Sequence, residues 1–237
     1  MVELRLAPSR ARARDLIRRG LVEIAGTVAT KPGRGVADDA VIAVSEQAGS
    51  HVSRGAVKLL AALRHFRFSA VGRIALDIGA SSGGFTEVLL GAGAQRVYAV
   101  DVGHGQLHPR LAGDPRVIAL EGMDARRLEP ALFPEPVDAI VADVSFISLL
   151  KALPAPLLLT RQGSWLVALI KPQFEAGRAA VGKGGIVRDP AARQGAVDLV
   201  RDWLDAQPGW RVVGVIPSPI AGRSGNQEFL LGAVRDR

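Results

Sequence analysis

Short apolar runs alternate along most of the chain with longer segments whose apolar residues recur at helical spacing. Short runs bounded by polar or glycine-containing turns are typical of strands covered on both faces, whereas apolar residues three and four positions apart are typical of helices. The pattern predicts strands at 74–78, 97–100, 117–120, 138–143, 165–170, 210–216 and 228–234, and helices at 53–66, 84–92, 149–160 and 191–206. This alternation predicts an α/β fold with a Rossmann-like, doubly wound and mostly parallel sheet, in which the final strand pair is compatible with one antiparallel strand at the edge.

The first 48 residues follow a different pattern. A helix is predicted at 9–20, where Ser9 can cap the N-terminus and Gly20 can end the helix. Apolar residues then alternate around Ala25-Gly26, which predicts a hairpin, and 41–44 is a closing strand. The sequence therefore predicts a small α+β domain over 1–48, a linker over 49–52 and a larger domain over 53–237.

The composition adds a basic charge that is concentrated near the N-terminus. Of the 237 residues, 48% are apolar, which is enough for a sizeable core. The formal net charge is +7, of which the first 60 residues carry +4. Such a distribution indicates a polyanionic partner. The candidate nucleic-acid contacts are Arg10, Arg12, Arg14, Arg18, Arg19 and Lys31, together with Arg178, Lys183 and Arg188 of a glycine-rich loop.

Several classes of protein are disfavoured by what the sequence lacks. The absence of cysteine excludes disulfides and thiolate metal sites, and no histidine–glutamate pattern such as H-E-x-x-H is present, so no metal is expected. No apolar run approaches the roughly 20 residues of a spanning helix, and no signal peptide is visible. We expect a cytoplasmic protein that does not enter membranes and that is a monomer or a weak dimer.

The stretch 73–101 carries the clearest chemical signal. It reads as strand, glycine turn, helix and second strand ending at Asp101, which is the organisation of a nucleoside-binding βαβ unit. Ser81 stands where a dinucleotide fingerprint has its second glycine, which disfavours a pyrophosphate and favours S-adenosylmethionine (SAM). The predicted cofactor contacts in this stretch are Asp77, Gly79, Ser81, Ser82, Gly83, Gly84, Phe85 and Asp101.

Polar residues at the ends of the predicted strands are further candidates, because ligands of such sheets bind beyond the carboxyl ends of the strands. Asp124, Asp143 and Lys171 lie at or just beyond strand ends. Glu228 reaches the same edge if the last strand is antiparallel, and Lys58 can point there from the preceding helix. Two lysines and two carboxylates in one cleft suit removal of the proton from a weakly acidic ribose hydroxyl.

The N-terminal residues resemble the S4 (αL) RNA-binding domain. They share with it an arginine-bearing helix ending in R-x-G, a small strand turn and a K-P-G turn, with a first helix shortened to 2–8. In that family the basic helix and the following turn lie on folded RNA. The resemblance therefore implies that RNA is the polyanionic partner.

Lys58, Asp143, Lys171 and Glu228 resemble the K-D-K-E tetrad of FtsJ-type ribose 2′-O-methyltransferases. The surrounding motifs match as well: V-S-R-G-A-V-K-L, D-I-G-A-S-S-G-G-F-T, A-D-V-S-F-I-S-L, I-K-P-Q-F-E-A-G and G-N-Q-E-F-L. Together with the N-terminal module, the whole chain resembles the TlyA family. That resemblance implies SAM-dependent 2′-O-methylation of cytidine in ribosomal RNA, as free RNA or in ribosomal subunits.

The same resemblance assigns roles to single residues. It implies that Lys171 is the central catalytic lysine and that Asp143 lies between it and the transferable methyl group. Asp101 would hold the SAM ribose, and Asp124 would face the adenine amino group.

Three other functions are compatible with parts of the sequence. Asp143-Val-Ser-Phe146 resembles the D-P-P-F/Y motif of base N-methyltransferases, although neither proline is present. A membrane-active protein is suggested by the haemolysin label of some TlyA members, but the chain has no apolar span and no strongly amphipathic lysine-rich helix. An NAD-dependent oxidoreductase is disfavoured by Ser81.

Overall fold

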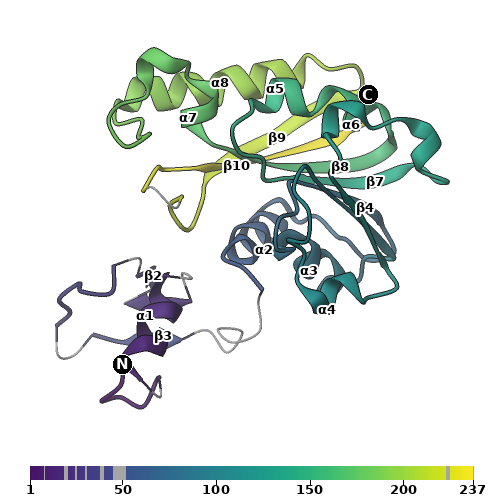
Figure 1. The fold of residues 1–237 in the computed structure, drawn as a ribbon. Helices are drawn as coiled ribbons and strands as arrows, with labels where there is room; N and C mark the ends of the chain where they lie inside the picture. Colours follow the sequence, from purple (N-terminus) through teal and green to yellow (C-terminus); the bar gives the residue numbers. More distant parts are fainter. Residues whose placement is uncertain are drawn as a thin grey trace.

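The computed structural model of the chain describes residues 1–7, 9–18, 21–24, 26–29, 31–37, 40–44, 52–222 and 225–236 (Figure 1). In the N-terminal part, helix α1 (Arg10–Arg18) packs with an antiparallel sheet in the order β2-β1-β3, made of β1 (Val22–Ile24), β2 (Thr27–Val28) and β3 (Ile42–Val44). Gly26 has φ +75°, as the hairpin between β1 and β2 requires. Residues 2–5 form turns, not a helix. Gly20, Ala25 and residues 49–51 of the predicted linker lie outside the described residues.

The larger sheet has seven strands in the order β6-β5-β4-β7-β8-β10-β9. The strands are β4 (Ile74–Ile78), β5 (Arg96–Asp101), β6 (Val117–Glu121), β7 (Val137–Ala142), β8 (Thr160–Ile170), β9 (Trp210–Pro217) and β10 (Phe229–Arg235). Strands β4 to β8 run parallel, and β10 is antiparallel to both of its neighbours. Because the chain proceeds from β4 to β5 on one side and returns to β7 on the other, the order of strands reverses between β4 and β7. Ligands of such sheets bind at this switch point.

Helices cover both faces of the sheet (Figure 1). One apolar core lies under α2 (Gly55–Phe66), α3 (Gly84–Gly91) and α4 (Pro109–Ala112). The other lies under α5 (Leu149–Ala152), α6 (Pro154–Leu158) and α8 (Pro190–Asp205), and α7 (Pro172–Glu175) packs beside α8. Short 3-10 turns are η2 (Ala125–Arg127), η3 (Pro130–Leu132) and η4 (Arg178–Ala180). Every residue of β4 and β7 is buried, as expected for central strands of a sheet with two covered faces. The predicted doubly wound, mostly parallel fold is confirmed.

The antiparallel strand is not at the edge of the sheet. It is β10, inserted between β8 and β9, so that β9 forms the edge. Its register pairs Phe229 with Ile170. The residue that precedes β10, Glu228, therefore lies beside the residue that follows β8, Lys171. An edge position for β10 would not explain this proximity.

Several element boundaries also differ from those predicted. Strand β8 begins at Thr160, five residues before the predicted start, and the helix predicted at 149–160 is two short helices, because Pro154 begins the second. The glycine-rich segment 173–189 contains part of α7 and a bridge between Gly182 and Ile186. Helix α2 begins at Gly55, and the Ser53 hydroxyl accepts a hydrogen bond from the Gly55 amide at 3.1 Å.

Candidate active site at the β4–β7 switch point

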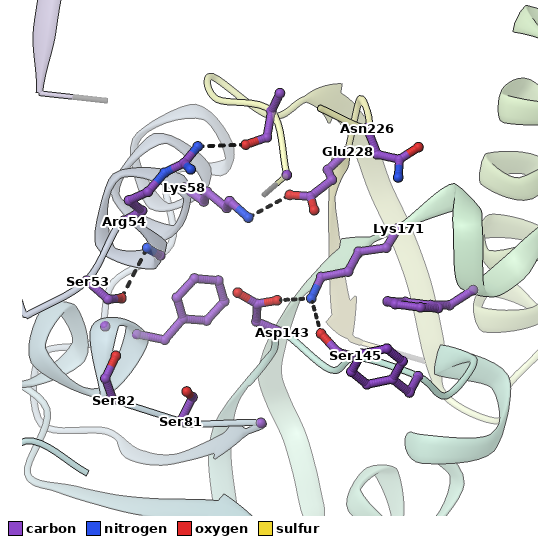
Figure 2. A pocket seen from close by; sticks show the side chains of 18 of the residues that line it. Ser53, Arg54, Lys58, Ser81, Ser82, Asp143, Ser145, Lys171, Asn226 and Glu228 are labelled. Atoms are coloured by element: carbon purple, nitrogen blue, oxygen red, sulfur yellow. Dashed lines mark hydrogen bonds and ion pairs between the residues drawn. The ribbon is translucent and has the colours of Figure 1, made fainter. Parts of the chain in front are cut away.

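Two adjoining cavities open beyond the carboxyl ends of β4 and β7. The first, of about 890 Å³, holds the side chains drawn in Figure 2, and the second, of about 1260 Å³, extends along the ends of β4 and β5. They share a wall that includes Gly79, Ser81, Asp143, Ser145 and Phe146. A ligand in one cavity can therefore reach a ligand in the other at this wall.

Gly79 permits the close approach of the two loops that form this wall. Its φ is +81°, and a Cβ placed there would lie 2.6 Å from the carbonyl oxygen of Asp143. The Asp143 amide donates to the carbonyl of Ile78 at 2.9 Å, so the loop after β7 is fixed against the end of β4. A side chain at residue 79 would push the two loops apart. Glycine at residue 79 is thus required by the packing of the two loops.

Asp101 organises the glycine turn from the tip of β5. Its two carboxylate oxygens accept hydrogen bonds from the amides of Ser81 and Gly103, each at 2.8 Å. A carboxylate has about four acceptor sites, so capacity remains for hydroxyl groups of a ligand. Asp101 lines the second cavity with the apolar side chains of Val102 and Met123. This arrangement suits a nucleoside whose ribose meets Asp101 and whose base lies on apolar surface.

Asp124 lines the same cavity. Its carboxylate is paired with the Arg126 guanidinium at 2.5 Å, and these hydrogen bonds lower its pKa to about 2. It is therefore ionised at neutral pH and can accept a hydrogen bond from a base amino group only in competition with Arg126. The contact predicted for Asp124 stays a prediction.

The remaining residues predicted to hold the cofactor divide into two groups. Gly79, Ser81, Ser82, Gly84 and Phe85 line the first cavity. Gly83 and Asp77 line neither cavity: a Cβ on Gly83 would meet the side chains of Leu107 and Leu111, and Asp77 is fully buried at the end of β4. Of these seven residues only Gly79 and Ser81 also line the second cavity, and cofactor contact stays a prediction for all seven.

Asp77 is a buried carboxyl with a strongly shifted pKa. Burial is the main cause that raises the pKa from 3.8 to about 7, and the hydrogen bond from the Thr86 hydroxyl at 2.6 Å opposes the shift. Asp143 and Asp101 raise it further by charge repulsion. The second oxygen, Oδ1, has no hydrogen-bond partner among the described residues.

The Asp77→Asn variant is expected to lose much of the pH dependence of the stability of the wild-type protein between about pH 4 and pH 7. Below this window both the folded and the unfolded state hold the Asp77 proton. Within it only the folded state does, so the free energy of unfolding of the wild type falls as pH rises, by a few kcal/mol at most. Urea unfolding followed by tryptophan fluorescence at several pH values measures how the free energy of unfolding changes with pH in the wild type and in Asp77→Asn. The same change with pH in both proteins would show that Asp77 titrates normally.

Lys58 and Glu228 form a buried ion pair that joins two distant parts of the chain. Lys58 lies on α2 and is 8% exposed, and Glu228 precedes β10 and is 3% exposed. The Nζ–Oε2 distance is 2.6 Å (Figure 2). A lysine and a glutamate are rarely so buried unless they are paired. Lys58 is therefore not a solvated surface charge.

Lys171 and Asp143 form the second pair, on neighbouring strands. Lys171 Nζ lies 2.6 Å from Asp143 Oδ1 and 2.9 Å from the Ser145 hydroxyl oxygen (Figure 2). All four charged residues, Lys58, Asp143, Lys171 and Glu228, line the first cavity, and Asp143 lines the second as well. The structure thus brings together the four residues that the sequence pattern singled out. It places the carboxylate of Asp143 where the two cavities meet.

Two buried side chains hold the loops around this site. Glu175 accepts hydrogen bonds from the Ser148 hydroxyl at 2.6 Å and from the Leu149 amide at 2.9 Å, so the loop after β7 is tied to α7. Burial raises the pKa of Glu175, against the effect of these hydrogen bonds. Asn226 accepts from the Val187 amide at 3.0 Å and donates to the Gly185 carbonyl at 2.7 Å. The glycine-rich loop is therefore fastened beside Glu228.

The basic residues predicted to bind nucleic acid lie in three places. Arg10, Arg14 and Lys31 border a small cavity of the N-terminal domain, and Arg178 lines the second cavity of the active site. Lys183 and Arg188 line neither active-site cavity. The side chains of Arg12 and Arg18, and Arg19 as a whole, lie outside the described residues.

Sequence reasoning missed several residues at the site, among them Arg54, Ser145 and Phe146. Arg54 lines the first cavity, and its guanidinium donates to the Ala221 carbonyl at 2.8 Å. Ser145 contacts Lys171. Phe146 is 93% exposed, lines both cavities and has φ +65°. Lys58, four residues away, marked the helix of Arg54, and the motif around Asp143 contained the other two. Their exposure and contacts carry no sequence signal.

Within the described ranges, no group of three or more histidine, cysteine, aspartate or glutamate side chains is placed to hold a metal ion. In the same part of the chain, no helix is both long enough and apolar enough to cross a membrane.

Two family models match the chain, and related proteins extend over most of it. The model of FtsJ-like methyltransferases matches residues 51–235, and that of the S4 domain matches residues 1–42. The chain is 47% identical over 232 residues to the Mycobacterium tuberculosis protein named 16S/23S rRNA (cytidine-2'-O)-methyltransferase TlyA, which covers 98% of this chain and 86% of that protein. It is 40% identical over 224 residues to Hemolysin A of Brachyspira hyodysenteriae, covering 94% and 92%. The crystal structure of a "putative hemolysin" from Lactococcus lactis has a TM-score of 0.75 at 43% identity, covering 78% of this chain and 89% of that one.

Proposed function

Because the chain belongs to the TlyA family, which joins an S4 domain to an FtsJ-like methyltransferase domain, we propose that it transfers a methyl group from SAM to the 2′-oxygen of a cytidine ribose in ribosomal RNA. The observation that carries this proposal is the convergence of two lysine–carboxylate pairs on one cavity. Asp143 faces that cavity and also the neighbouring one, which has the features of a nucleoside site. One cavity takes the acceptor ribose and the other takes the cofactor.

The residues of the second cavity fit SAM. Asp101 retains acceptor capacity for the ribose hydroxyls, and Val102 and Met123 offer an apolar surface to adenine. Gly79 and Ser81 of the glycine turn line this cavity as well. When bound, SAM supplies an electrophilic methyl group on a positively charged sulfur.

Lys171 is the general base in this proposal. Its Nζ accepts the proton of the ribose 2′-hydroxyl while the oxygen forms a bond to the methyl carbon, and the electron pair of the broken carbon–sulfur bond stays on sulfur. Asp143, at 2.6 Å, holds Nζ in place and offers a negative charge at the boundary of the cofactor cavity. Lys58 and Glu228 line the same cavity as a second ion pair. Positioning and electrostatics supply most of the rate enhancement.

Ribosomal RNA as the acceptor is supported by basic residues in both domains. Arg10, Arg14 and Lys31 gather on the S4 domain, and Arg54 and Arg178 lie at the two cavities. Contacts of this kind to phosphates fix the register of an RNA on a protein. We place this reaction in the cytoplasm, with the protein acting as a monomer or a weak dimer.

The Phe146→Ala variant is expected to raise the KM for RNA by about 5- to 100-fold while the Kd for SAM stays within about threefold, because stacking of one base on an aromatic ring contributes about 1–3 kcal/mol. The ring is exposed beside the acceptor cavity, 5.4 Å from the Phe174 ring centroid, so it can receive an unstacked base. Steady-state methylation of ribosomal RNA and SAM titration measure the two constants. Leu158→Ala, which also truncates an exposed apolar side chain, is the matched control. An unchanged KM would exclude stacking on Phe146.

Label transfer tests the choice of acceptor. The full chain is incubated with SAM carrying a radioactive methyl group and with small subunits, large subunits or protein-free ribosomal RNA in separate reactions. Label is expected in the RNA of at least one of these substrates. A control reaction with transfer RNA is expected to give no label. A failure to label any ribosomal substrate would contradict the proposal.

Two other activities remain as alternatives. Base N-methylation would use the same cofactor cavity, but the segment after Asp143 lacks the prolines of the D-P-P-F/Y motif. Membrane lysis is the activity that the name of the Brachyspira relative denotes. Detergent-free protein is expected to release no haemoglobin from washed erythrocytes, and dose-dependent release would favour that second alternative.

A further inference from the structure

The amino group of Lys171 is held by two hydrogen-bond acceptors. Asp143 Oδ1 lies 2.6 Å from Nζ, and the Ser145 hydroxyl oxygen lies 2.9 Å from it (Figure 2). The carboxylate belongs to the tetrad, whereas the hydroxyl does not. Both come from one segment, which leaves β7 and ends at the capped start of α5. Lys171 itself is buried at the end of β8.

Two acceptors determine where the lone pair of a neutral amine points. A neutral lysine has two N–H groups and one lone pair in tetrahedral arrangement, and a lysine with no acceptors rotates freely about its last bond. If Asp143 and Ser145 each accept one N–H, the lone pair must occupy the third direction. Lys171 lines the first cavity, so a hydroxyl bound there is the group that this direction would face.

The chain is held in place on both sides of Ser145. On one side, the Asp143 amide donates to the Ile78 carbonyl at 2.9 Å. On the other, Ser148 caps α5 and donates to Glu175 at 2.6 Å. The chain turns sharply in between, at Phe146 with φ +65°, a conformation that few residues other than glycine adopt. Such local strain persists only where the surrounding structure fixes it.

We propose that Ser145 is a positioning residue for Lys171: together with Asp143 it sets the rotation of the amino group so that the lone pair faces the 2′-hydroxyl of the acceptor. This inference rests on the proposed function, because it assigns Lys171 the role of base. The proton leaves the 2′-oxygen for Nζ, the oxygen–methyl bond forms as the sulfur–methyl bond breaks, and Ser145 keeps its own proton throughout. Once protonated, Nζ has three N–H groups, and Asp143 and Ser145 continue to accept two of them.

The test compares Ser145→Ala with Ser145→Thr. We expect Ser145→Ala to lower kcat for RNA methylation by about 10- to 100-fold, the effect of one hydrogen bond to a charged or reacting group. The KM for RNA and the Kd for SAM should stay within about threefold. Ser145→Thr keeps a hydroxyl at the same carbon and should restore kcat to within about threefold of wild type. Ser69→Ala, which removes a serine hydroxyl that accepts from the Val71 amide at an exposed turn, is the matched control.

A second measurement does not depend on RNA. Acetic anhydride acetylates lysine amines, and peptide mass spectrometry gives the relative rate at each lysine. The rate at Lys171 is expected to rise at least threefold in Ser145→Ala, because one of its two restraints is gone, while the rate at Lys151 in the same protein stays constant. Lys151 is an exposed lysine on α5.

The outcomes separate the two proposals. The wild-type protein could fail to methylate RNA while Ser145→Ala still raises the rate of acetylation at Lys171. In that case the proposed function is wrong, but the contact between Ser145 and Lys171 is supported. If Ser145→Ala keeps wild-type kcat, or if Ser145→Thr fails to rescue while KM and SAM affinity deteriorate, the positioning role is overturned and Ser145 is only part of the loop.

Discussion

Replacing Lys171 with methionine is expected to lower the rate of methyl transfer by about 100- to 10,000-fold while leaving the Kd for SAM within about threefold, because a positioned general base contributes rate and not cofactor affinity. Methionine preserves much of the aliphatic volume at this buried position but can neither accept a proton nor pair with Asp143. Asp143 is partly exposed, so its carboxylate remains hydrated when the partner is lost. Single-turnover transfer and SAM titration measure the two quantities.

Arg201→Met is the matched control for removal of a cation. Arg201 lies on α8, where it pairs with Asp198 and Asp202 at the surface and lines neither active-site cavity. It should retain wild-type transfer and SAM affinity. A Lys171→Met variant with more than a tenth of wild-type activity would contradict the assignment of the base.

The second large effect is expected at the buried pair of Lys58 and Glu228. Glu228→Leu is expected to lower the free energy of unfolding of the methyltransferase domain by about 3–5 kcal/mol, because it leaves the Lys58 ammonium buried without its partner. The double variant Lys58→Met/Glu228→Leu removes both charges and should return to within about 1–2 kcal/mol of wild type. Neither variant should transfer methyl groups at more than a small fraction of the wild-type rate.

Urea unfolding followed by tryptophan fluorescence measures this cycle. All three tryptophans of the chain, Trp165, Trp203 and Trp210, lie in the larger domain, so the signal reports on that domain and not on the N-terminal one. The double variant is itself the control for loss of activity through unfolding: it should be stable and inactive. Additive destabilisation in the double variant would mean that the two charges do not interact across 2.6 Å as the structure has them.

The central part of the fold could be predicted from the sequence because its signals are local. The run 74–78, the glycines after it and the acid at Asp101 follow one another in the chain, and each has a direct physical reason in the structure. Asp143, Lys171 and Glu228 of the tetrad were likewise marked by their places at strand ends, whereas Lys58 lies on a helix. The role of Lys58 in the site is evident only from its ion pair with Glu228, which lies 170 residues away in the chain.

What could not be predicted depends on how distant segments pair. The order β8-β10-β9 follows from strand pairing and not from any local pattern, yet it is this order that brings Glu228 beside Lys171. The hydrogen bonds of Asn226 to the glycine-rich loop are equally non-local, because they join residues about 40 positions apart. Phe146 reads in the sequence as one more apolar residue, and only its exposure distinguishes it from the core.

The central claim, that this chain methylates the 2′-oxygen of cytidine in ribosomal RNA, is tested most directly by identifying the methylated nucleoside. Ribosomal RNA treated with wild-type protein or with Lys171→Met and SAM is digested completely to nucleosides and separated by liquid chromatography with mass spectrometry. We predict 2′-O-methylcytidine, with the added mass on the sugar fragment, in the wild-type reaction and none above background with the variant. A methyl group on the base fragment, or equal amounts of product from both proteins, would contradict the claim.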